Sequence, residues 1–190
     1  MKKTFKFTCL ITIIIFCLLL CSCANKNQGS ENFYDFTFKI DNTSITLPSS
    51  IKAFTDAGFN FPADFNYFDK NIAPGNLETT YLYEGDNWFN VEIINNTDSA
   101  LILNDCKIGR FTYDFSGNLE IYTADNFKLN GKKLNDILKK YGEPYSQAEY
   151  STYIEVIYDK DPTSGIYDRY TFRFDNKTNE LCQVDIIHFY

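Results

Sequence analysis

The chain contains one histidine, His188, and two cysteines, Cys106 and Cys182, beyond its first 23 residues. A cysteine thiol beside a histidine could form a nucleophile–base pair for covalent catalysis. Such a pair also needs an acid that orients the histidine and donors that stabilise an oxyanion, and the sequence near His188 offers neither. We therefore expect His188 to be a structural or surface residue, assign no catalytic residue, and expect no enzyme activity.

Metal and cofactor motifs give no more support for catalysis. The segment 159–165 begins like a calcium-binding loop, but its glycine lies at position 7 instead of 6, and Tyr170 stands where a glutamate is needed. The sequence has no Cys-x-x-Cys pair, Gly-x-Ser-x-Gly elbow, phosphate-binding loop or dinucleotide fingerprint. We expect a hairpin loop at 159–165, and no metal ion or cofactor.

Cys106 and Cys182 permit two interpretations. As a disulfide they would close a loop of about 76 residues and contribute ~4 kcal/mol in the chain-entropy model. As free thiols they would be small core residues, because Cys182 alternates with Val184 and Ile186 in an apolar row. We favour free thiols, with both side chains facing a core.

Aromatic side chains are the candidates for a binding surface. The chain has 18 Phe and 14 Tyr but one Trp, Trp88, which lies beside an expected turn at 85–87. Aromatic residues give a large contact area at a low cost in conformational entropy, and Trp88 is the best candidate for an exposed one. Phe65, Tyr67 and Phe68 lie in an irregular segment, 59–76, that we expect to contribute to the same surface.

The elements that would position these residues follow an export signal. Lys2, Lys3 and Lys6 precede an apolar run from Leu10 to Leu20. The run is shorter than the ~20 residues that span a bilayer comfortably. A basic start followed by a short apolar segment is typical of a secretory signal peptide.

Cys23 follows Leu20, Cys21 and Ser22, and this context resembles the lipobox of bacterial lipoproteins. The resemblance implies cleavage after Ser22, a diacylglyceryl thioether on Cys23, and a lipid anchor in the cell membrane at its extracytoplasmic face. Cys21 is the alternative site, and an uncleaved transmembrane anchor or a plain secretory signal are the alternatives for the segment. We expect a signal peptide over 1–22, a flexible tether over 23–32 and a folded domain over 33–190.

The charge of the chain excludes two kinds of partner. The formal net charge is −7, and loss of residues 1–22 removes three lysines and no acids, which gives −10. Neutralising phosphates needs clustered Lys and Arg, so we expect no nucleic acid partner and no electrostatic docking on anionic lipid. Aromatic residues make up 17% of the chain, which favours a domain rich in β-sheet.

Two segments have the spacing of short helices, and each precedes several alternating, strand-like runs. The first helix is expected to begin at Ser49 or Ser50 and to end at Gly58, and the second to begin at Asn130 and end at Gly142. Their apolar positions are Ile51, Phe54 and Ala57 in the first and Leu134, Ile137, Leu138 and Tyr141 in the second. We predict an α+β fold of two similar units, 33–118 and 119–190, each a short helix packed on an antiparallel β-sheet.

The segment from Gly131 to Pro144, with Asp136, Ile137 and Tyr141-Gly142 between them, is similar to a signature of uncharacterised lipoproteins of low-GC Gram-positive bacteria. A helix that ends in Gly-x-Pro before antiparallel strands also resembles the small outer-membrane assembly lipoproteins (SmpA/OmlA-like) and the tandem β-lactamase-inhibitor-protein fold. These resemblances imply binding to another envelope protein without catalysis.

The sequence is compatible with three functions. The favoured one is a membrane-anchored, non-enzymatic module that binds another protein at the cell envelope. The alternative is a surface protein that captures carbohydrate or peptide. A hydrolase that uses carboxylates is third, because no Asp or Glu stands out in the sequence as its acid or base.

Overall fold

The computed structural model describes residues 31–165 and 167–190, and β-structure dominates this part of the chain. Its two α-helices, α2 (Ile51–Asp56) and α3 (Leu134–Tyr141), have six and eight residues. The predicted signal peptide and most of the predicted tether lie outside the described residues. The last two tether residues begin a 3-10 helix, η1 (Glu31–Asp35).

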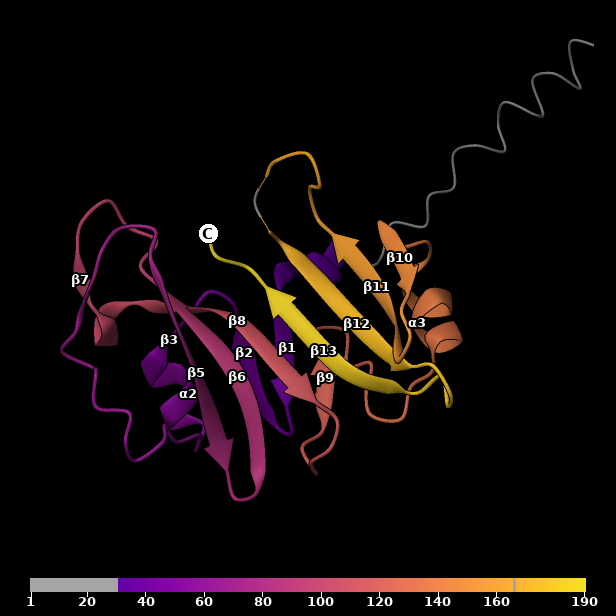
Figure 1. Cartoon of the computed structure of the whole chain (residues 1–190), viewed down its shortest axis with the longest axis horizontal. Helices are drawn as coiled ribbons and strands as arrows, with labels where there is room; N and C mark the ends of the chain where they lie inside the picture. The colour runs from indigo at the N-terminus through magenta and orange to yellow at the C-terminus, as the bar shows by residue number, and fades with distance from the viewer. Residues whose placement is uncertain (1–30, 166) are drawn as a thin grey trace, which may run out of the picture.

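Eight antiparallel strands form the main sheet (Figure 1). Seven of them lie in the order β10-β11-β12-β13-β8-β6-β5, and the two-residue strand β3 pairs with β8. The bounds in that order are Ser146–Glu149, Tyr153–Asp159, Arg169–Asp175, Leu181–Ile187, Lys107–Asp114, Asn87–Ile94 and Leu77–Glu84, with β3 at Ser49–Ser50.

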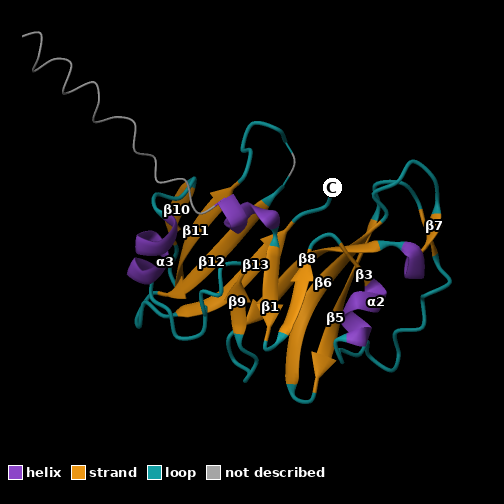
Figure 2. Ribbon diagram, turned by 180° about the vertical axis from the view of Figure 1, so that it is seen from behind, coloured by secondary structure: helices purple, strands orange, loops and turns teal. Residues whose placement is uncertain are grey.

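A second layer covers one face of the main sheet (Figure 2). It contains the three-stranded sheet β2 (Thr43–Thr46), β1 (Thr37–Ile40) and β9 (Ile121–Thr123), together with the helices. The two layers meet through aromatic rings: Phe38 on β1 lies 4.7 Å from Phe111 on β8, and Phe54 on α2 lies 6.3 Å from Phe89 on β6. Two-residue strands β4 (Asn71–Ile72) and β7 (Leu101–Ile102) pair separately, and a 3-10 turn, η2 (Leu103–Asp105), follows β7.

Local sequence signals account for both helices. Ser50 caps α2 as predicted, since its Oγ accepts a hydrogen bond from the Ala53 N–H at 3.2 Å. The chain leaves α2 through Gly58, whose φ of +97° suits glycine. The α-helix α3 begins at Leu134, four residues after the predicted start, and the Asp136 carboxylate accepts from the Lys133 N–H at 2.9 Å, which places a favourable negative charge at the N-terminus.

The prediction of an α+β fold made of two helix-on-sheet units is wrong. Strands from the second half complete the sheets of the first half, because β13 pairs with β8 and β9 pairs with β1. Backbone hydrogen bonds therefore join residues 33–118 and 119–190 both in the main sheet and in the three-stranded sheet. The short helices supply only part of the layer that covers it, so the fold is mostly β.

The segment η1 is fixed to the domain by aromatic stacking. Phe33 is 1% exposed, and its ring lies 4.1 Å from that of Tyr141 and 4.3 Å from that of Tyr170. Phe36, just after η1, stacks at 4.5 Å on His188 near the C-terminus. Both ends of the described chain are thus held in the same aromatic core.

Three buried tyrosines predict a loss of stability at alkaline pH. Burial raises the pKa of Tyr141, Tyr158 and Tyr170 above their ordinary value of about 10. A raised folded-state pKa means that these groups contribute fully below about pH 10 and that their contribution is lost as the pH rises beyond it. Urea denaturation at about pH 8 and about pH 11 should show a much lower midpoint at the higher pH. The variant Tyr170→Phe should reduce that difference, and an unchanged difference would contradict the assignment.

Candidate binding face

The second face of the main sheet, named here the open face, is seen from the front in Figure 1, where no described element covers it. On β8, Phe111 and Tyr113 are buried in the core, so Arg110, Thr112 and Asp114 point to the open face. The cross-strand registers continue this polar row onto neighbouring strands. Its other members are Asn90 and Glu92 on β6, Gln183 and Asp185 on β13, Thr171 and Arg173 on β12, and Glu155 on β11.

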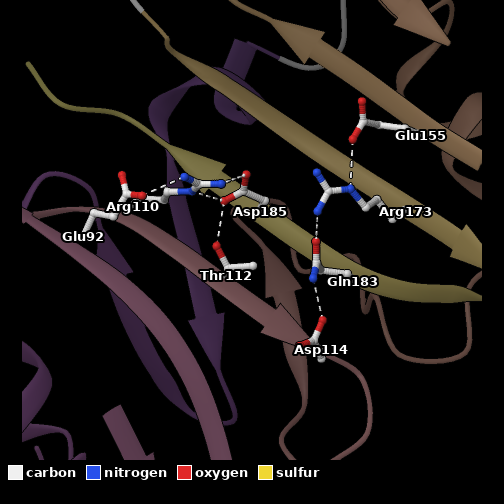
Figure 3. Close-up of polar contacts among 8 residues, drawn as sticks. All are labelled: Glu92, Arg110, Thr112, Asp114, Glu155, Arg173, Gln183 and Asp185. Atoms are coloured by element: carbon white, nitrogen blue, oxygen red, sulfur yellow. Dashed lines mark hydrogen bonds and ion pairs between the residues drawn. The ribbon is translucent and has the colours of Figure 1, made fainter. Parts of the chain in front are cut away.

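Arg110 is held by carboxylates from the strands on both sides of it (Figure 3). Its Nε and Nη2 donate to Asp185 at 2.7 and 2.9 Å, and its Nη1 donates to Glu92 at 2.8 Å. The Thr112 hydroxyl also donates to Asp185, at 2.8 Å. Asp185 is only 2% exposed. Hydrogen bonding to Asp185 raises the pKa of Arg110, so the guanidinium stays charged and compensates the buried carboxylate.

A second chain of polar contacts lies beside the first (Figure 3). Arg173 on β12 donates from Nε to Glu155 on β11 at 2.8 Å and from Nη1 to Gln183 on β13. Gln183 Nε2 donates in turn to Asp114 on β8 at 2.6 Å. Side-chain bonds therefore connect four adjacent strands, which fixes the shape of the open face.

A hollow of about 230 Å³ lies between the two networks. Its lining residues are Thr79, Asn90, Val91, Glu92, Arg110, Thr112, Arg173 and Gln183. The charged members of this lining are all engaged in the ion pairs described above. This arrangement can offer ordered donors and acceptors to a partner.

Three aromatic residues, named here the aromatic corner, stand at the end of the hairpin formed by β5 and β6. The Trp88 ring lies 4.7 Å from that of Tyr81 and 6.0 Å from that of Tyr83, and Trp88 is 55% exposed. Hollows of about 280 and 370 Å³ adjoin the corner. The first is lined by Tyr81, Asp86, Trp88, Phe89, Asn90, Tyr113, Asp114, Ser116 and Gly117, and the second by Pro62, Ala63, Asp64, Tyr81, Tyr83, Gly85 and Trp88.

The other predicted surface aromatics do not join this corner. Phe65 and Phe68 are half-buried and pack on Phe61, with ring separations of 4.9 and 5.2 Å. Tyr67 is 53% exposed, and its ring contact is with Phe65. Most of this cluster therefore stabilises the crossing segment.

Both cysteines of the described chain are free thiols. Cys106 is buried as predicted, but the prediction that Cys182 faces a core is wrong, because its side chain is exposed. The register between β12 and β13 shifts between Arg173 and Phe174, and this irregularity leaves Cys182 outside the alternating buried row. Loss of hydration around the sulfur raises the pKa of both thiols, which disfavours their reactive thiolate forms.

The candidates for metal or nucleophilic chemistry have structural roles. His188 Nδ1 lies 2.8 Å from Asp168 Oδ1, and this partner is a carboxylate instead of a cysteine. The segment 159–165 belongs to the hairpin loop between β11 and β12, where Asp161 accepts from the Thr163 N–H at 3.1 Å. Over residues 31–165 and 167–190, no group of three or more His, Cys, Asp or Glu side chains could hold a metal ion.

The polar networks of the open face were not predicted from the sequence. Arg110, Asp185 and Arg173 each alternate with buried apolar residues along a strand, and this pattern was a usable signal for an exposed face. Their pairing depends on strand order, which the alternation does not give.

Comparisons with known proteins gave no matching family model, no matching curated protein and no matching solved structure. The resemblance to envelope lipoproteins thus stays a prediction. Cys23 lies outside the described residues, and within them no helix is long and apolar enough to cross a membrane.

Proposed function

We propose that this protein is a non-enzymatic binding module that acts at the cell envelope, is anchored to the membrane through lipid on Cys23, and binds another envelope protein through the open face. The observation that carries the proposal is the pairing of the half-buried Arg110 with the buried Asp185 within an ordered polar surface. A fixed pattern of charges and amides suits specific recognition, because little side-chain entropy is lost when a partner binds. The exposed Trp88 adds the large aromatic contact that is common at protein interfaces.

The test places a bulky charge on the open face and, as a control, on the opposite side of the molecule. Asn90→Arg changes an exposed residue of β6, and Thr55→Arg changes an exposed residue of α2, which belongs to the covering layer. We expect crosslinking and recovery from an envelope extract to yield one abundant partner with the wild type and with Thr55→Arg. Recovery with Asn90→Arg should fall at least about tenfold, as expected for a disrupted interface centre. Equal recovery with all three proteins would exclude the open face.

A second candidate function is capture of a glycan or peptide at the aromatic corner. It is favoured by the exposed Trp88 beside polar residues such as Asp86 and Asn90 in the 280 Å³ hollow. A ligand array should then give binding that is lost in Trp88→Ala and kept in Tyr67→Ala, which removes an equally exposed ring elsewhere. Loss in both variants, or in neither, would contradict this function.

The proposed anchor makes a separate prediction. Cys23→Ser should abolish incorporation of labelled palmitate and release the protein from the membrane fraction, because a single thioether carries the anchoring chains. Cys21→Ser serves as the matched control and should leave labelling intact. The reverse pattern would assign the lipid to Cys21, and labelling of both variants would contradict a lipid on either cysteine alone.

A further inference from the structure

The two edges of the main sheet differ in length. One edge is β10, which has four residues, and the other is β5, which has eight. Proteins commonly protect a long edge with proline, lysine or a bulge. The β5 sequence, Leu-Glu-Thr-Thr-Tyr-Leu-Tyr-Glu, contains neither proline nor lysine, and its register with β6 runs without a shift. Apart from a bridge between Tyr83 and Asn60 near its end, the β5 edge is therefore open to pairing with another strand.

The hydrogen-bonding pattern shows which backbone groups of β5 are free. Tyr83 exchanges two hydrogen bonds of 2.9 Å with Asn60 on the side of β5 away from β6. Because outward and inward groups alternate along an antiparallel strand, the N–H and C=O groups of Tyr81, Thr79 and Leu77 also point outward. In the described chain these groups have no backbone partner outside the strand pairing with β6. Thr79 is exposed and Leu77 is 47% exposed, so a partner strand can reach them.

The free edge leads to the aromatic corner. The hollow of about 370 Å³ is bounded by Tyr81 and Tyr83 of β5, by Trp88, and by residues 62–64 across the edge. A strand that pairs along Leu77, Thr79 and Tyr81 would therefore place its next side chains over this hollow. One extended segment could therefore pair with the backbone of β5 and also place side chains in the hollow.

Charge indicates the chemistry of the occupant. Asp64 and Asp86 line the hollows at the corner, and Glu84 is exposed at the end of β5. Within residues 31–165 and 167–190, none of these three carboxylates belongs to an ion pair. A basic segment would complement them and could also stack cations on the exposed rings. A second copy of this acidic chain would instead bring like charges together.

We propose that an extended, basic segment of a partner protein binds along β5 as an additional strand of the main sheet and ends in the aromatic corner. This inference rests on the proposed protein-binding function and specifies its partner. Backbone hydrogen bonds to Leu77, Thr79 and Tyr81 supply affinity for any extended chain, and the acidic corner selects basic ones.

The probe is the synthetic heptapeptide Lys-Val-Lys-Tyr-Lys-Val-Lys. It is tested against the full-length chain in detergent, by binding isotherms and by hydrogen–deuterium exchange. Thr79→Pro removes an outward N–H and is compatible with an edge strand, whereas Thr79→Val keeps the N–H and is the matched control. A second peptide carries N-methyl groups on the backbone amides along one edge, so it lacks these hydrogen-bond donors while the protein is unchanged. This peptide tests the pairing even if Thr79→Pro does not fold.

We expect the peptide to slow exchange over residues 77–81. Thr79→Pro and peptide methylation should each weaken binding at least about tenfold, Thr79→Val should stay within about twofold, and a peptide with glutamate in place of lysine should bind far more weakly. Unchanged affinity of the methylated peptide, no binding of the lysine peptide, or dimerisation of the protein through β5 without peptide would overturn the inference. If Thr79→Pro still recovers an envelope partner and Asn90→Arg does not, the proposed strand pairing along β5 is overturned, while the proposed binding through the open face is supported.

Discussion

Replacing Arg110 with methionine is expected to lower the free energy of unfolding by about 3 kcal/mol. The substitution leaves the Asp185 carboxylate, which is 2% exposed, with the Thr112 hydroxyl as its remaining side-chain partner. A buried charge without its counter-ion costs far more than the pair itself contributes. Urea denaturation followed by circular dichroism measures the loss directly.

Two control variants make this result specific. Arg110→Lys keeps the charge but cannot donate two parallel hydrogen bonds, so we expect a loss of about 1–2 kcal/mol. Lys52→Met removes an ion pair with Asp56 whose side chains are 77% and 62% exposed, and it should change stability little. A loss below about 1 kcal/mol for Arg110→Met would show that Asp185 is solvated and that the open face is less rigid than we propose.

Replacing Phe33 with alanine should cost about 3–4 kcal/mol. Its ring lies between those of Tyr141 and Tyr170 at interplanar angles of 24° and 23°, so two stacking contacts and a buried volume are lost together. The loss should also release η1, because Phe33 is its fully buried anchor. We expect limited proteolysis to cut near residues 31–36 in the variant before the rest of the domain.

Phe65→Ala is the comparison, since Phe65 is a half-buried ring that packs against the edge of the core, and it should cost about half as much. If Phe33→Ala resisted proteolysis and lost no more stability than Phe65→Ala, the stacked column would not anchor the start of the domain.

Local elements followed from the sequence because their causes are local. The cap at Ser50, the glycine that ends α2 and the alternating strand from Tyr170 to Phe174 all depend on neighbouring residues. The strand β10, Ser-Gln-Ala-Glu, carries little apolar alternation, so its pairing with β11 gave no sequence signal. The fold class was wrong because the pairing of β13 with β8 joins residues about 70 positions apart, and propensity does not encode it.

In the candidate site, too, features with local causes could be predicted and features that depend on strand pairing could not. Trp88 was found because an aromatic residue beside a tight turn tends to be exposed, whereas Cys182 was misplaced because a register shift between strands interrupts the alternation. The Arg110–Asp185 pair could not be predicted, since the two residues meet only when the strand order is known.

The position of β13 sets the order in which the domain can assemble. Residues 181–187 come last among the strands of the described chain, yet they lie in the interior of the main sheet, between β12 and β8. A growing polypeptide that lacks them holds two partial sheets, each with an exposed edge that invites wrong pairing. The main sheet can therefore be completed only after synthesis has passed residue 187, and a chain kept extended until that point avoids wrong pairing at the two exposed edges.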